Sequence, residues 1–180
     1  MQSDSTVCGD RATIWVHAEA FGYGPSALAL TILPRLRKLV AVSGAPTTLE
    51  YVGQGHTIEL NTSPPWDKVH ECDISNAHGR EALTHLVRLH RPSLVISIVD
   101  EPFAQLVSQL ESTKLIIVDQ LLWSWPSIPE TWRKAAKIIA VEYVGVRERI
   151  HKEHLNNAVI VPPFCLSPTT LLLWDHEKGP

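Results

Sequence analysis

Acidic, histidine and aromatic side chains follow the apolar runs of this 180-residue sequence. The run ATIWVH ends at His17, and Glu19 and a glycine-bearing turn come directly after it. The side chains that follow this run and two later ones are His17, Glu19, Phe21, Gly22, Tyr23, Gly24, Asp100, Glu101, Asp119, Trp123 and Trp125. If the runs are parallel strands, these residues lie along one edge, because open parallel sheets bind ligands beyond the carboxyl ends of their strands. The pattern is typical of an apolar small-molecule cleft with a few polar anchors.

The glycine turn could also hold a phosphate, since Gly22-Tyr23-Gly24 is followed by Ala27 in a near match to G-x-G-x-x-G. Glu19 would place a negative charge beside a pyrophosphate, and Pro25 removes one N–H donor from the helix start. The run KLVAVS, expected as the second strand, ends at Ser43 instead of a ribose-binding acid, and no G-K-[ST] occurs. We therefore expect no nucleotide cofactor. The glycines either permit a tight turn or shape a loop that recognises a neutral or polar ligand.

Apolar β-rich runs alternate with helical patterns along most of the chain. The expected strands are 12–17, 38–43, 57–61, 94–100, 114–119, 137–143 and 158–164. The expected helices are 25–36, 76–90, 102–111, 129–136 and 146–155, with Pro34 kinking the first of them or ending it early. This order predicts an α/β fold, a Rossmann-like three-layer domain with a mostly parallel sheet. We expect a flexible N-terminus over 1–11, a single domain over 12–165, and a tail or linker over 166–180.

The composition excludes several classes of function. Hydrophobic residues make up 44% and charged residues 19%, with a net charge of −3, so neither nucleic acid nor a membrane is an expected partner. Cys8, Cys72 and Cys165 are far apart and odd in number, which favours reduced thiols in a cytoplasmic protein. His151 and His154 share a helix face but lack a third ligand nearby in the sequence, so no metal site is expected.

Three stretches resemble the N-terminal domain of glycosyltransferases of the two-Rossmann-domain (GT-B) type. They are IWVHAEAFGYGPSALALTILPRLRK, LVISIVDEPFAQL and LIIVDQLLWSWPSIPE, and the resemblance spans roughly 12–164. In that family the N-terminal domain mainly binds the acceptor, the C-terminal domain mainly binds the sugar nucleotide, and transfer occurs between them. The resemblance implies an acceptor-binding half that supports transfer from a nucleotide sugar to a small polar or aromatic acceptor.

The resemblance also assigns roles to the residues of the predicted edge. His17 or Glu19 would be the base that takes a proton from an acceptor hydroxyl. The three acids Asp100, Glu101 and Asp119 would hold acceptor groups or orient that base. Trp123 and Trp125 would stack against a sugar or ring, and the loop from His17 to Gly24, with Phe21, Gly22 and Tyr23, would form the floor of the cleft.

The sequence ends at Pro180, close after the last expected strand, so the donor-binding half is expected in another domain or subunit. The expected partners are therefore a nucleotide-sugar donor, a small-molecule acceptor and a second protein domain or subunit, and with a second subunit the protein would be a hetero-oligomer. The alternative is a non-catalytic ligand-binding or regulatory module that has lost transfer. A stand-alone hydrolase is disfavoured because no G-x-S-x-G elbow occurs.

Overall fold

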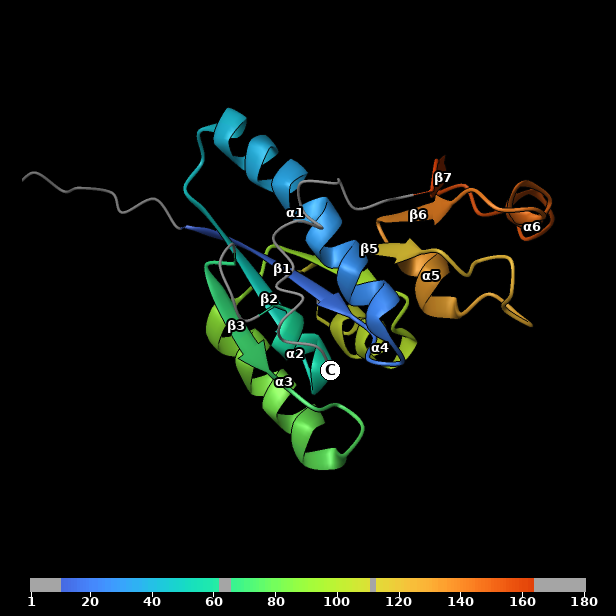
Figure 1. The fold of residues 1–180 in the computed structure, drawn as a ribbon. Helices are drawn as coiled ribbons and strands as arrows, with labels where there is room; N and C mark the ends of the chain where they lie inside the picture. The colour runs from blue at the N-terminus through green and yellow to red at the C-terminus, as the bar shows by residue number, and fades with distance from the viewer. Residues whose placement is uncertain (1–10, 62–65, 111–112, 164–180) are drawn as a thin grey trace, which may run out of the picture.

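The sheet of this protein is wholly parallel. The computed structural model describes residues 11–61, 66–110 and 113–163, and in this part of the chain seven strands pair in the order β3-β2-β1-β4-β5-β6-β7 (Figure 1). The strands are β1 (Ala12–Ala18), β2 (Thr47–Gly53), β3 (Lys68–Glu71), β4 (Leu94–Ile98), β5 (Lys114–Asp119), β6 (Lys137–Val141) and β7 (Ala158–Val161). The predicted α/β, Rossmann-like fold is confirmed.

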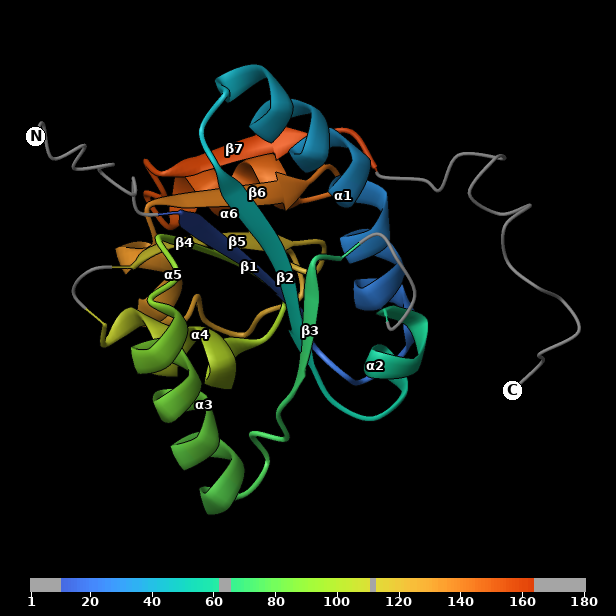
Figure 2. The same ribbon diagram turned by 90° about the vertical axis from the view of Figure 1, so that its left-hand side faces the viewer.

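Helices cover both faces of the sheet and complete the three layers. They are α1 (Tyr23–Ser43), α2 (His56–Asn61), α3 (Ala77–His90), α4 (Glu101–Ser108), α5 (Glu130–Lys134) and α6 (Val146–Lys152). Helices α1 and α2 lie against one face, and α3, α4, α5 and α6 cover the other (Figures 1 and 2). This division follows from right-handed crossovers that leave the sheet in opposite directions on either side of β1.

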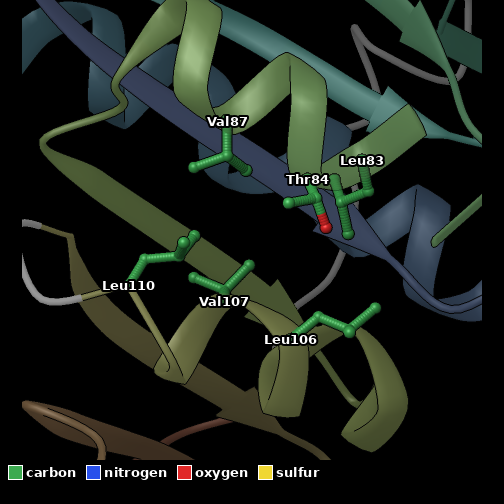
Figure 3. Close-up of a pocket in the computed structure, with 6 residues that line it drawn as sticks. All are labelled: Leu83, Thr84, Val87, Leu106, Val107 and Leu110. Atoms are coloured by element: carbon green, nitrogen blue, oxygen red, sulfur yellow. The ribbon is translucent and has the colours of Figure 1, made fainter. Parts of the chain in front are cut away.

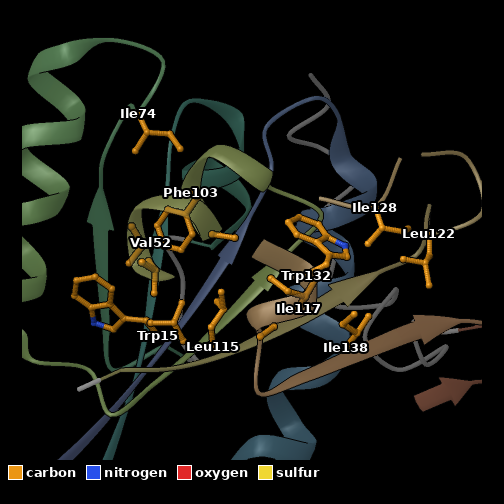
Figure 4. Close-up of a cluster of buried hydrophobic side chains, with 14 of the residues drawn as sticks. Trp15, Val52, Ile74, Phe103, Leu115, Ile117, Leu122, Ile128, Trp132 and Ile138 are labelled. Carbon is orange, nitrogen blue, oxygen red and sulfur yellow. The ribbon is translucent and has the colours of Figure 1, made fainter. Parts of the chain in front are cut away.

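Each face of the sheet has its own apolar core, because successive side chains of a strand point to opposite faces. Trp15 of β1 joins the core beneath α3 to α6, with Phe103 and Trp132 (Figure 4). Val16, the next residue, joins the core beneath α1, with Leu33. All five side chains are fully buried, and burial of such large apolar groups is the main stabilising term of the fold.

The predicted second strand, 38–43, is wrong, because these residues are the last two turns of α1. Pro34 does not end the helix early: it lies on the exposed side, where water can bond the carbonyl that it leaves unpaired. Leu36 and Val40 lie one turn apart on the face that packs against the core, which carries the helix onward. Gly44 ends it in the left-handed conformation, at φ 65°.

The true second strand is β2, over residues for which the sequence predicted neither a strand nor a helix. It is buried on both faces, although Glu50 lies at its centre. The predicted strand 57–61 is also wrong, since these residues belong to the short helix α2. A further edge strand, β3, pairs with β2 where no strand was predicted. The two strands on this side of β1 were therefore missed together.

Two further expectations concern the ends of the chain and membranes. Residues 1–10 and 164–180 lie outside the described residues, so the boundaries proposed at 11/12 and 165/166 stay predictions. None of the helices in the described part of the chain is long and apolar enough to cross a membrane.

Candidate functional site

The order of strands in the sheet reverses between β1 and β4, and this switch point places the candidate site. The two strands are hydrogen-bonded neighbours, and Glu19 N–H extends their ladder by donating to Ile98 O at 3.1 Å. From here β1 leads to α1 on one face, whereas β4 leads to α4 on the other (Figure 1). Diverging connections of this kind open a crevice beyond the strand ends, which is where ligands of such sheets bind.

The structure brings His17 and Asp100 together at this point. His17 Nε2 lies 2.9 Å from Asp100 Oδ2, and its Nδ1 lies 2.9 Å from Val52 O. The ring is only 2% exposed and stacks on Phe103 at 3.7 Å between centroids. Both ring nitrogens therefore face oxygen atoms, and the His17–Asp100 pair is buried.

Asp100 is held in its charged form by its neighbours. Burial alone would raise the pKa of Asp100, but the hydrogen bond and charge of His17 and the Phe103 N–H outweigh burial and hold that pKa below its ordinary value. The Phe103 N–H bond, 2.8 Å long, makes Asp100 the N-cap of α4. Glu101 lies in the first turn of the same helix, partly buried, where the helix dipole favours an acid.

The turn before Asp100 is strained. Val99 has a φ of 61°, in the left-handed region that a β-branched residue rarely adopts, and it is buried. Its N–H still donates to Val118 O at 3.1 Å, which holds the turn against β5. Such strain costs on the order of 1–3 kcal/mol and is typical of functional sites. Here it occurs in the residue that connects β4 to the Asp100 cap.

Glu19 lies beside this pair in a different electrostatic state. Its side chain is half-buried, and burial, with the negative charges of Asp100 and Asp119, raises its pKa from 4.5 to about 7, although His17 acts in the opposite direction. A carboxyl group with this pKa exchanges its proton near neutral pH, as a general base or acid must. The two predicted catalytic residues therefore differ. Both ring nitrogens of His17 are in hydrogen-bond contact, whereas the Glu19 carboxyl makes no hydrogen bond within the described part of the chain.

Exposed rings surround the switch point. Phe21 and Tyr23, in the turn after β1, are 58% and 51% exposed, and Trp123, after β5, is 49% exposed. Gly22 is the N-cap of α1, and Gly24 in its first turn faces the side chain of Gln120. The first four of the predicted binding residues thus lie together, with the loop after β5 opposite them.

Two other predicted binding residues serve the protein interior. Asp119 is fully buried, and its carboxylate accepts hydrogen bonds from Leu121 N, Trp125 Nε1 and Trp132 Nε1 at 2.7, 2.9 and 2.7 Å. Trp125 packs edge-on against Trp132, at 5.5 Å between ring centroids. Burial raises the pKa of Asp119 despite these donors. Both residues hold the loop between β5 and α5 in place.

Sequence reasoning missed His56, at the start of α2. Its ring meets Tyr23 edge-on at 5.0 Å, and its Nε2 is buried without a hydrogen-bond partner among the described residues. The sequence GQGH was the available signal, but it points to this edge of the sheet only when β2 is known to precede it.

The position of β2 also bears on nucleotide binding, because a ribose-binding acid is expected at the end of the second strand. Strand β2 ends at Gly53 and is followed by Gln54, so the observed second strand also has no acid at its end.

Two hollows of the structure lie away from this edge. One is a void of about 10 Å³ between α3 and α4, lined by Leu83, Thr84, Val87, Leu106, Val107 and Leu110 (Figure 3). It has room for about one water molecule and is mainly apolar, so it marks imperfect packing of two helices. The other lies beside α6 and the turn that follows it, near His151 and His154.

Comparison with known proteins supports the fold at the level of architecture. A scan against protein-family models and a search of curated proteins give no match. Among solved structures, UDP-GlcNAc 2-epimerase from Methanocaldococcus jannaschii is similar, with a TM-score of 0.57 and 13% sequence identity. The match covers 84% of this chain and 45% of the epimerase chain, so this chain spans less than half of that protein's length. The likeness supports a GT-B-like, Rossmann-like domain.

Proposed function

We propose that this chain is the acceptor-binding half of a glycosyltransferase. In this proposal the carboxyl edge holds a small polar or aromatic acceptor, and a donor-binding domain or subunit outside this chain supplies the nucleotide sugar. Glu19 takes the proton of the acceptor hydroxyl as its oxygen bonds to the anomeric carbon and the nucleoside diphosphate leaves. The observation that carries the proposal is the half-buried Glu19 at the switch point, with its pKa near 7.

The surroundings of Glu19 support this assignment. Both ring nitrogens of His17 are engaged, so we assign His17 and Asp100 to positioning and to setting the charge of the site. The rings of Phe21, Tyr23 and Trp123 offer apolar walls for an acceptor. The similar epimerase is named for a UDP-linked sugar, and this agrees with nucleotide-sugar chemistry on this architecture.

The test is sugar transfer by the chain combined with the donor-binding partner isolated from its natural source. Phenols and other small hydroxyl compounds are offered with a panel of nucleotide sugars, and products are identified by mass spectrometry. We expect transfer, with Glu19→Gln lowering kcat about 10²- to 10⁴-fold. The rise of kcat/KM through pH 7 should disappear in this variant, whereas His151→Gln on the distant helix α6 should match the wild type. Absence of transfer with every donor and acceptor would refute the proposal.

The second candidate is a ligand-binding or regulatory module without chemistry. It is favoured by the state of His17, which is 2% exposed and has no ring nitrogen free to take a proton. Under this alternative the same acceptor panel binds, and Glu19→Gln changes the dissociation constant, but no product forms under any condition. NMR titration of the chain with the panel, run beside the transfer assay, separates the two functions.

A further inference from the structure

A second cluster of ionisable side chains lies beneath α3, away from the candidate site. It joins Glu50 at the centre of β2, His70 on β3 and His90 at the end of α3. Glu50 and His70 are each 6% exposed, and the His90 side chain is 16% exposed. His90 precedes the connection into the start of β4, so the cluster lies toward the amino edge of the sheet, opposite the switch point.

The three side chains converge on one point. Glu50 Oε2 lies 2.7 Å from His70 Nε2 and 3.5 Å from His90 Nδ1. One ligand atom from each residue falls within 4.8 Å of the other two. Ligand atoms around a tetrahedral zinc ion stand about 2.0–2.2 Å from the metal, and therefore about 3.3–3.5 Å from one another. The distance between Glu50 Oε2 and His70 Nε2 would have to increase by less than about 1 Å for an ion to bind between these ligands.

The surroundings fit a metal site better than a solvated charge cluster. Trp15 Nε1 donates to Glu50 Oε2 at 3.0 Å and so fixes the orientation of the carboxylate, as partners of metal ligands do. His70 and His90 also lie close to each other, with 4.6 Å between their ring centroids, so both imidazoles are near the carboxylate. Lys68 is the nearby positive charge that opposes an ion, and it is exposed.

We propose that Glu50, His70 and His90 bind one zinc ion, with solvent completing a tetrahedral site. The two histidines and one carboxylate are borderline ligands that suit zinc better than magnesium or calcium. Two of them lie on paired strands and the third on the helix that covers them, so the ion would fasten β2, β3 and α3 together. The partial exposure of His90 provides the route by which the ion enters. This inference does not depend on the proposed glycosyltransferase function.

The test uses the full chain freed of metals by a chelator. We expect one zinc ion per chain in native mass spectrometry, a higher thermal midpoint with zinc than without it, and visible absorption of a tetrahedral kind with cobalt. In the wild type, zinc should also shift the NMR signal of the Trp15 indole N–H, which bonds directly to the ligand Glu50. The last measurement needs no variant and so does not depend on a mutant that folds.

Matched histidine variants on α3 separate this site from adventitious binding. Loss of a hydrogen bond that supports a metal ligand weakens metal binding roughly 10- to 100-fold. Because His90 is itself a proposed ligand, His90→Gln should weaken zinc binding by more than this. His85→Gln, an exposed histidine on the same helix, should bind as the wild type does. The proposal fails if zinc leaves the Trp15 signal and the thermal midpoint unchanged. It fails equally if His90→Gln, folded by circular dichroism, binds zinc as tightly as His85→Gln.

Discussion

Glu19 and Asp100 are carboxyl groups at the ends of neighbouring strands, yet their pKa values shift in opposite directions. Asp100 is bonded to the His17 ring and to a backbone N–H, and these contacts outweigh burial, so its charged form is stabilised. Glu19 is half-buried and faces two negative charges, so its neutral form is stabilised and its pKa rises to about 7. Carboxyl groups whose pKa values are pushed apart in this way take different roles in proton transfer. In the proposed reaction Glu19 is the group that exchanges the proton, whereas Asp100 stays ionised.

The raised pKa of Glu19 predicts how Glu19→Gln changes stability with pH. Below the ordinary carboxyl pKa the residue is protonated in the native and unfolded states, so its ionisation costs nothing there. As the pH rises from about 4.5 through 7, the unfolded state ionises first, and the wild type loses stability. At pH 8 we expect Glu19→Gln to unfold with a free energy about 2 kcal/mol higher than the wild type, less than the full shift implies because the side chain is partly exposed.

Urea unfolding at pH 5 and pH 8 measures this difference, with Glu81→Gln on the exposed side of α3 as the control. The gain of Glu19→Gln should be larger at pH 8 than at pH 5, and Glu81→Gln should change little between them. A gain that is equal at both values, or larger at pH 5, would show that Glu19 is not held in the neutral form.

At the scale of elements, the loop from β5 to α5 depends on a single carboxylate. Asp119 accepts one backbone and two indole N–H groups, and through them it joins Trp125 and Trp132 to the end of the strand. Trp125 in turn contacts the cores on both faces of the sheet. This loop also carries Trp123 at the carboxyl edge of the sheet. The position of Trp123 therefore depends on the buried hydrogen bonds of Asp119 beneath the loop.

Asp119→Ala should therefore destabilise the protein strongly. The change leaves three N–H groups without their acceptor, two of them on indoles in or near the core, and we expect a loss of about 3 kcal/mol in the free energy of unfolding. Denaturant unfolding followed by tryptophan fluorescence measures the loss. Trp123→Phe, on the same loop but half exposed, should stay within about 0.5 kcal/mol of the wild type. Equal effects of the two changes would mean that the hydrogen bonds to Asp119 contribute nothing to the loop.

The elements that the sequence predicted well are the ones whose pattern matches their burial. Strands β4 and β5 are nearly unbroken apolar runs, as strands covered on both faces must be. Strand β2 is buried as fully, but Glu50 interrupts its pattern, and its buried carboxyl depends on tertiary partners that include Trp15 and His70. The residues 38–43 look like a strand because positions 39–42 form an unbroken apolar run, although Leu39 and Val42 are exposed on α1.

The same limits apply to the candidate site. That His17 and Asp100 share an edge follows from their positions at strand ends. Their direct contact, and the bond from His17 to Val52 O, depend on where β2 lies and on the strained turn at Val99. The cluster of Glu50, His70 and His90 could not be predicted because two of its residues lie on the strands that were missed.

At the scale of the whole molecule, apolar side chains at the carboxyl edge are left uncovered in the described part of the chain. Phe21, Tyr23 and Trp123 are joined there by Tyr143 and Val144, which follow β6 and are 49% and 96% exposed. Exposed apolar groups gathered at one edge are typical of surfaces that meet a partner. The donor-binding half that we propose would dock on this edge.

Two exposed valines at opposite ends of the sheet test where the proposed donor-binding half docks. Val144 lies at the carboxyl edge, whereas Val42 lies in the last turn of α1 near the amino edge and is 79% exposed. Because both side chains are in solvent, Val144→Asp and Val42→Asp should each leave the stability of the chain within about 0.5 kcal/mol. Only Val144→Asp should weaken association with the donor-binding half, by tenfold or more in surface plasmon resonance, since a charge would be buried at the interface. If Val42→Asp weakens association as much, or Val144→Asp not at all, then the partner does not cover the carboxyl edge, and Glu19 would face solvent during any reaction.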